Sequence, residues 1–151
     1  MADHILDRSV WSALATVHAR FSLGSQSARR FQSDISPLSA ARDEGLESLI
    51  ESANLIGSTD RIIIGQANRI ICPPDTRATI MITAWQMLYD DSKSQYRRGH
   101  AVEQLGENDA PAMMALVALV KPDPFVDRTH LLGEYWGIKQ GGDWLQWPAN
   151  V

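Results

Sequence analysis

The spacing of apolar and polar positions in the first half of the chain predicts a helix followed by a strand. The apolar residues that recur at helical spacing are Leu46, Leu49, Ile50 and Ala53. They predict a helix over 43–53 that has acidic residues in its first turn and ends before Gly57. The three consecutive isoleucines within 61–65 then predict a buried strand, and a helix that leads into such a strand is typical of an α/β layer.

Residues 78–89 form a second apolar run, which is rich in Ile, Thr, Trp and Tyr. These residue types favour a long strand, although the Met, Ala, Gln and Leu among them also permit a helix. We interpret the run as a strand, in which Trp85 and Met87 are core or interface residues. The polar, charged stretch 90–100 follows and is the clearest internal boundary of the chain.

The segment 101–138 has the most informative pattern in the chain, because strand, helix, loop and strand signals follow one another there. Val102 and Leu105 indicate a short strand, and 135–139 indicates a second one. Between them, apolar residues on every side predict a mostly buried helix over 110–120. Asp109 is expected to cap its first turn, and Pro111 fits there because the missing N–H has no partner in that turn anyway.

Composition narrows the class of protein without defining its activity. The 151 residues carry a net charge of −4, with 44% hydrophobic and 21% charged residues. These are values of a globular protein. The balance favours neither nucleic acid nor an anionic membrane as a partner, and the N-terminus lacks the pattern of a signal peptide, so we expect a cytoplasmic protein. The four histidines are scattered and Cys72 is the only cysteine, so no metal site is expected.

The segment LGENDAPAMMALVALVKPDPFVDRTHLLGEYWGI resembles the opening of the catalytic domain in one branch of the GNAT superfamily of acetyl-CoA-dependent N-acetyltransferases. In that branch the pattern is DxPAMxALxxLxxPGPFxxRTxxLGxYxGI, and Asp123 stands where it has a glycine. The matching residues are Leu105, Asp109, Pro111, Ala112, Met113, Ala115, Leu116, Leu119, Pro122, Pro124, Phe125, Arg128, Thr129, Leu132, Gly133, Tyr135, Gly137 and Ile138.

The resemblance implies an α/β fold with a mixed sheet and a division of the chain into three segments. Residues 1–89 would be a degenerate GNAT-like N-terminal subdomain, 90–100 a linker, and 101–151 the N-terminal portion of an acyl-CoA N-acyltransferase domain, with its first strand, helices and second strand. It also implies that Phe125, Arg128, Thr129 and Tyr135 border the site of an acceptor amine, either a small molecule or a peptide. Their alternative roles are structural: Phe125 as a plug over the helix, Arg128 as a carboxylate partner and Thr129 as a helix cap.

By resemblance the cofactor is acetyl-CoA, whose pyrophosphate such enzymes hold at a strand-to-helix turn with the pattern [QR]-x-x-G-x-[GA]. No segment of the chain matches that pattern at every position. We therefore expect that this chain, as a fragment that stops early in the catalytic domain, is inactive and binds acetyl-CoA weakly or not at all. The alternative is a non-catalytic interaction module that pairs, with a second copy or another chain, through an exposed sheet edge.

The last nine residues, DWLQWPANV, differ in composition from the apolar strand that the resemblance leads us to expect there. The codons of this tail can be chosen so that a reading frame that begins one base earlier, at the end of the Gly142 codon, encodes Arg-Leu-Val-Ala-Met-Ala-Gly-Glu-Arg. That sequence fits the expected strand. We therefore favour a shifted reading frame over 143–151, and ordinary divergence is the alternative.

Overall fold

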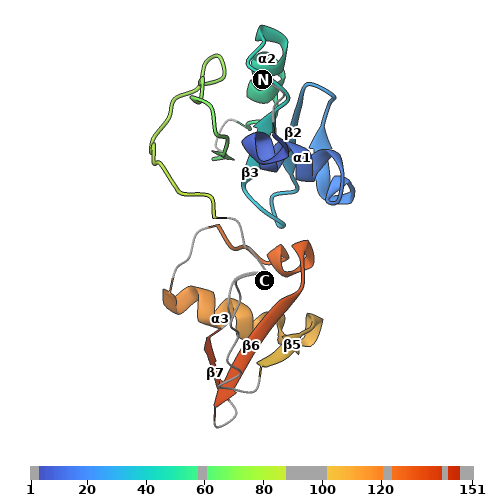
Figure 1. Ribbon diagram of the computed structural model, residues 1–151, viewed down its shortest axis with the longest axis vertical. Coiled ribbons are helices and arrows are strands. Elements are labelled where there is room, and N and C mark those ends of the chain that lie inside the picture. The colour runs from blue at the N-terminus through green and yellow to red at the C-terminus, as the bar shows by residue number, and fades with distance from the viewer. Residues whose placement is uncertain (1–3, 58–60, 88–101, 121–123, 141–142, 147–151) are drawn as a thin grey trace.

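The computed structural model describes residues 4–57, 61–87, 102–120, 124–140 and 143–146. These residues form two units, each built on one sheet, which lie one above the other in Figure 1. We call residues 4–87 the N-terminal part and residues 102–146 the C-terminal part. The predicted α/β class with a mixed sheet is confirmed. The predicted linker at 90–100 lies outside the described residues.

The N-terminal part is a four-stranded sheet in the order β1-β2-β3-β4, with helices packed beside it. Strands β1 to β3 are antiparallel neighbours, and β4 runs parallel to β3 after the crossover helix α2. Its elements are η1 (Ile5–Arg8), α1 (Ser9–Ala15), η2 (Ala19–Phe21), β1 (Ser22–Gly24), β2 (Ala28–Phe31), β3 (Leu38–Ala41), α2 (Leu46–Asn54) and β4 (Ile63–Ile64).

A tight turn joins β1 to β2, and it depends on one glycine. Gly24 has a φ of 119°, and a Cβ added there would lie 2.4 Å from the Ala28 carbonyl oxygen. The turn is closed by the Ser25 hydroxyl, which accepts hydrogen bonds from the N–H groups of Ser27 and Ala28. This hairpin fixes the register in which Ser22 faces Phe31.

The buried core of the N-terminal part lies between helix α1 and the sheet, and the C-terminal part adds to it. Its buried apolar side chains are Leu14, Phe21, Phe31 and Ile35. Leu131 and Leu132, which lie about a hundred residues later in the chain, pack against this cluster. The two parts therefore share apolar contacts across the region where they meet in Figure 1.

The C-terminal part is a three-stranded antiparallel sheet in the order β5-β6-β7. Its elements are β5 (Val102–Leu105), η4 (Glu107–Asp109), α3 (Ala110–Val120), η5 (Thr129–Leu132), β6 (Tyr135–Gln140) and β7 (Asp143–Gln146). The predicted strands and the helix between them are confirmed, and β5 pairs directly with β6, with Val102 opposite Ile138 and Leu105 opposite Tyr135.

Helix α3 begins where it was predicted, but its environment differs from the prediction. Met113 is buried, whereas the Leu119 side chain is 81% exposed, so a mostly buried helix was the wrong expectation. Among the described residues, helix α3 packs on β7, and such a contact covers only one side of a helix. The Asp109 carboxylate accepts a hydrogen bond from the Gly106 N–H, so it closes the turn η4 that leads into the helix.

Two strand predictions in the N-terminal part need correction. The isoleucine run is a strand only at Ile63–Ile64, the last strand in the order of its sheet, and the predicted burial is not met because Ile63 is exposed and Ile64 half-buried. The run at 78–87 forms no helix or strand, and the Trp85 and Met87 side chains are exposed, so neither is a core residue and only the interface role stays a prediction. The residue types at 78–87 favour a strand, but a strand also needs a neighbouring strand with which to form hydrogen bonds.

The sheet of the C-terminal part continues further than the sequence predicted. We expected only its first and second strands, but Asp143–Gln146 forms a third strand, β7, which pairs antiparallel with β6. The register of this pairing shifts between Ile138, which faces Gln146, and Lys139, which faces Trp144, so a bulge or irregularity lies within it. The start of the unusual tail therefore forms a strand in its present sequence, and 147–151 lies outside the described residues.

Candidate functional site

The four residues predicted to border an acceptor site lie close together around Thr129. The Phe125 and Tyr135 rings meet edge to face, with their centroids 5.9 Å apart. The Tyr135 hydroxyl donates to the Thr129 carbonyl over 3.3 Å. Arg128 precedes Thr129 at the start of η5, and β6 begins at Tyr135, so a loop and a strand end supply the group.

Thr129 is the buried centre of this group. Its hydroxyl accepts a hydrogen bond from the Val126 N–H over 2.8 Å and donates one to the Ile35 carbonyl over 2.7 Å. The Thr129 N–H in turn donates to the Val126 carbonyl over 3.0 Å. Thr129 therefore closes its own loop and joins it to the N-terminal part. It is not the helix cap considered as its structural role, because the N-cap of η5 is Arg128, which makes no side-chain cap hydrogen bond.

Arg128 also contacts the N-terminal part. Its Nη1 lies 2.7 Å from Oδ2 of Asp34, and its backbone N–H donates to the Asp34 carbonyl over 2.8 Å. The Arg128 and Asp34 side chains are 47% and 43% exposed. Arg128 is thus a carboxylate partner, and its guanidinium remains accessible to a solute from the solvent.

Tyr135 is a hydrogen-bond donor at neutral pH. Burial raises the pKa of the Tyr135 hydroxyl above its usual value of about 10, because the phenolate form loses its hydration inside the protein. The proton therefore stays on the oxygen that donates to Thr129. The group as a whole offers one accessible cation beside an aromatic pair, and the hydroxyls of Thr129 and Tyr135 already have backbone partners.

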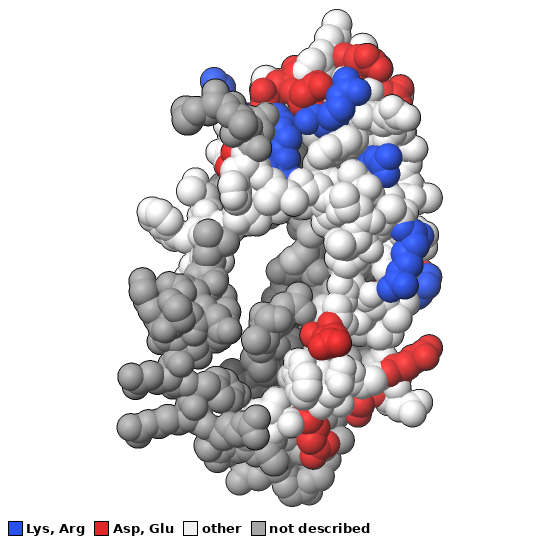
Figure 2. Space-filling view, turned by 45° about the vertical axis from the view of Figure 1, so that its right-hand side comes forward, with Lys and Arg blue, Asp and Glu red and all other residues white. Residues whose placement is uncertain are grey.

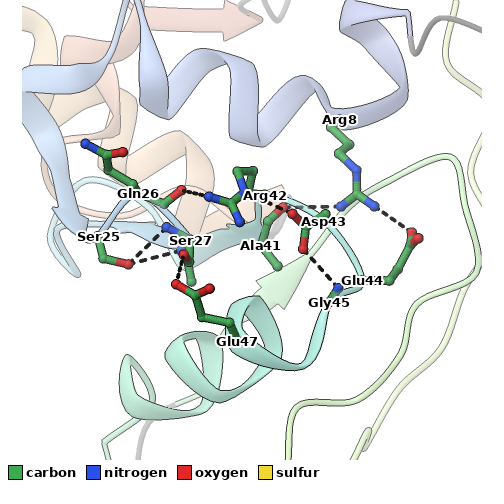
Figure 3. A network of polar contacts seen from close by, with 11 residues as sticks. Arg8, Ser25, Gln26, Ser27, Ala41, Arg42, Asp43, Glu44, Gly45 and Glu47 are labelled. Atoms are coloured by element: carbon green, nitrogen blue, oxygen red, sulfur yellow. Dashed lines mark hydrogen bonds and ion pairs between the residues drawn. The ribbon is translucent and has the colours of Figure 1, made fainter.

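A second candidate site, which the sequence analysis missed, is the turn between β3 and α2 (Figure 3). The turn has the sequence Arg42, Asp43, Glu44, Gly45, Leu46 and Glu47. These residues match [QR]-x-x-G-x-[GA] at every defined position except the last, where Glu47 stands. The turn also has the local structure that the pattern requires, because it joins a strand to the N-terminus of a helix whose N-cap is Gly45. A scan that allowed one mismatch between a strand and a helix signal would have found it.

Acidic side chains of the chain itself fill this turn. Oδ1 of Asp43 accepts from the Gly45 N–H over 2.9 Å, and its Oδ2 lies 2.9 Å from Nε of Arg42. The neighbouring Ser48 hydroxyl, the Arg42 guanidinium and the Gly45 N–H lower the pKa of Asp43 to about 2. The carboxylate is therefore ionised at neutral pH and occupies the position in which a helix N-terminus would bind a phosphate.

Neighbouring contacts close the rest of the turn, as Figure 3 shows. Glu47 accepts from the Ser27 hydroxyl over 2.9 Å, and Arg8 Nη2 lies 2.5 Å from Glu44 Oε1. The hollow beside the turn, between β3, β4 and α2, has room for about 10 Å³. Such a space holds a single water molecule. The hollow itself is therefore too small for a pyrophosphate group.

The charged side chains are distributed unevenly between the two parts. Figure 2 shows basic side chains grouped over the upper half of the molecule and acidic ones at its top and across its lower half.

Within the described residues no group of three metal-ligating side chains is found. A search of the same residues found no helix that is long and apolar enough to span a membrane.

Comparison with solved structures reveals a likeness over most of the chain. The chain is similar to the crystal structure of a protein from Novosphingobium aromaticivorans DSM 12444 that is assigned as an acetyltransferase of the GNAT family. The TM-score is 0.71 and the sequence identity 26%, over 94% of this chain and 62% of that one. No protein-family model matches the chain, and no curated protein matches it. The chain thus spans less than two thirds of the length of the structure it resembles.

Proposed function

We propose that this chain, which is a member of the GNAT superfamily, derives from an acetyl-CoA-dependent N-acetyltransferase that transfers an acetyl group to an amine. The observation that carries the proposal is the structural likeness over 94% of the chain to a GNAT-family protein. The match of the residues around Phe125, Arg128, Thr129 and Tyr135 to one branch of that superfamily supports it independently.

The acceptor amine lies, in this proposal, against a face formed by the accessible parts of Phe125 and Arg128, and the buried Tyr135 supports Phe125. The accessible guanidinium of Arg128 suits an acceptor that also carries a carboxylate or phosphate, because arginine binds such groups through two parallel hydrogen bonds. Phe125, which is half-buried, offers apolar surface, and the buried Tyr135 ring packs against it edge to face. The division into an N-terminal subdomain, a linker at 90–100 and a catalytic portion from 101 is part of the same proposal.

By itself, the chain is proposed to have no acetyltransferase activity. Among the described residues, the turn that comes nearest to the pyrophosphate pattern is occupied by Asp43, and a second anion there would meet an ionised carboxylate. The N-terminus of α3 is also a poor site for a phosphate. Glu107 and Asp109 place negative charge before it, and Pro111 removes one N–H donor. A shifted reading frame over 143–151 remains our interpretation of the tail, and the nucleotide sequence after the Gly142 codon decides it.

Isothermal titration with acetyl-CoA tests the proposal in two steps. The unmodified chain should bind with a dissociation constant weaker than about 1 mM, which is a binding free energy of about −4 kcal/mol. The double variant Asp43→Ala with Glu47→Ala removes the internal anion and completes the pattern, so its affinity should become measurable. Glu51→Ala on the same helix is the control and should leave the titration unchanged.

Two outcomes would contradict the proposal. A low-micromolar dissociation constant for the unmodified chain, or turnover of a primary amine in proportion to its concentration, would show that the chain builds a cofactor site elsewhere. If the double variant folds and its affinity equals that of the control, Asp43 and Glu47 are not what prevents acetyl-CoA from binding at the turn between β3 and α2.

A second function has one observation in its favour. The exposed apolar segment 78–87 has high strand propensity and no strand partner within the described residues. A non-catalytic module that associates through this segment is therefore the alternative. This alternative predicts that the unmodified chain self-associates. It also predicts that the double variant Asp43→Ala with Glu47→Ala does not bind acetyl-CoA.

A further inference from the structure

Two short segments that lie 94 positions apart join the N-terminal and C-terminal parts through polar contacts. Asp34 and Ile35 follow β2, and Arg128 and Thr129 begin η5. The contacts are the ion pair between Arg128 and Asp34, the hydrogen bond between the Arg128 N–H and the Asp34 carbonyl, and the bond from the Thr129 hydroxyl to the Ile35 carbonyl. We call these four residues the joint.

The contacts of the joint differ in strength because they differ in burial. The ion pair is partly exposed on both sides, and such pairs typically add little to stability because water and salt screen them. Thr129 and Ile35 are buried, so loss of the Thr129 hydroxyl would leave a buried carbonyl and a partly buried N–H without partners. The joint therefore depends more on Thr129 than on Asp34.

The joint contacts the aromatic pair of Phe125 and Tyr135. The carbonyl of Thr129 accepts from the Tyr135 hydroxyl, and the Tyr135 ring holds Phe125 edge to face. Leu131 and Leu132, in the same turn as Thr129, pack on the core of the N-terminal part. The position of the aromatic pair is thus linked through consecutive contacts to Asp34 and Ile35.

We propose that Asp34 and Ile35 are positioning residues, which fix the loop 125–135 from the N-terminal part and so set the shape of the acceptor face. The inference rests on the proposed function for the identity of that face. It assigns a task to the N-terminal part that differs from cofactor binding: this part forms the support against which the acceptor loop is held. The variants below separate this role from a general contribution to stability.

The test is hydrogen exchange of backbone amides in the 151-residue chain without ligand. In Asp34→Ala, exchange at Arg128, Thr129 and Leu131 should accelerate about two- to fivefold, as expected for a partly exposed ion pair. In Thr129→Val the acceleration should reach about tenfold or more, because two hydrogen bonds shielded from water are lost. Thr129→Ser retains the hydroxyl and should exchange like the unmodified chain.

Glu44→Ala is the matched control, because it removes an ion pair with Arg8 that lies away from the joint. It should leave the amides of 126–135 unchanged. Exchange in β2 and β3 should remain unchanged in Asp34→Ala, which separates local release of the loop from global unfolding. The inference is overturned if the loop amides exchange equally in Asp34→Ala, Thr129→Val and the control, or if all described amides accelerate together. Failure of the proposed function is detected separately, by the titrations with acetyl-CoA.

Discussion

In our proposal, the carboxylate of Asp43 determines whether the N-terminus of helix α2 can bind a second anion. The unpaired N–H groups and the dipole of a helix N-terminus favour an anion, and Asp43 supplies one from the preceding residues of the same chain. Its pKa of about 2 indicates that the folded protein stabilises the charged form. The ionised Asp43 therefore stabilises the fold, and in our proposal it also disfavours a phosphate at this position.

We predict that Asp43→Ala destabilises the protein at pH 7 by about 1 kcal/mol or less, because solvent weakens the interactions of a half-exposed side chain. The Asp43 side chain is 48% exposed. Its folded pKa lies below the usual value of about 3.9, so this stability is fully present above pH 4 and is lost as the pH falls toward 2. Urea denaturation at pH 7, 4 and 2.5 measures the difference between the two proteins.

Asp43→Asn is the companion variant for this experiment. Its side-chain oxygen can still accept from the Gly45 N–H, so it should lose less stability than Asp43→Ala and show a flatter dependence on pH. A constant difference between the unmodified protein and Asp43→Ala from pH 7 to 2.5 would show that the charge of Asp43 does not contribute.

At the scale of elements, local signals predicted the positions of the elements well in the C-terminal part and less well in the N-terminal part, where the run at 78–87 forms no strand. They predicted burial poorly in both parts. The strand at Val102–Leu105, the helix at Ala110–Val120 and the strand that begins at Tyr135 have the predicted order because alternation, proline and acidic residues act within one or two turns. Burial depends on which other elements are nearby. The same apolar composition that predicted a buried helix is compatible with an exposed Leu119.

Helix α3 offers a direct test of how burial varies along one helix. Of its side chains that the structure describes, Met113 is buried, whereas Leu119 is exposed. Met113→Ala should destabilise the protein by about 2 kcal/mol, the lower end of the range for buried methionine, since neighbouring positions on the helix are open. Leu119→Ala removes a similar volume from an exposed position and should change stability by less than about 0.5 kcal/mol. Thermal or urea unfolding of the two variants measures both values, and equal losses would show that the helix is covered on both sides.

For the whole molecule, the sequence predicted the members of the candidate site but not what holds them. The motif around Phe125, Arg128, Thr129 and Tyr135 identified residues that do lie together. Nothing in the chain near Thr129 indicates Asp34 or Ile35, because the contact spans 94 positions and both partners are common residue types. The turn at Arg42 to Glu47 was missed for another reason, since a strict pattern rejects a sequence in which one position is changed.

The last prediction concerns association of whole molecules through the exposed segment 78–87. Its large apolar side chains are Ile80, Met81, Ile82, Trp85 and Met87, and all of them are exposed. Exposed apolar area of this kind together with high strand propensity favours pairing between chains, because each pairing buries side chains and supplies backbone partners. We therefore expect concentration-dependent self-association, which sedimentation velocity measures directly.

The double variant Ile82→Lys with Trp85→Lys should shift the protein toward the monomer at the same concentration, since charges on an edge oppose pairing. Val17→Lys is the control, because Val17 is an exposed apolar residue of a different segment and a single lysine there also changes the net charge. If the unmodified chain sediments as a monomer at all concentrations, the segment is not an association surface. If the control dissociates the chain as well as the double variant does, net charge and not this segment governs association.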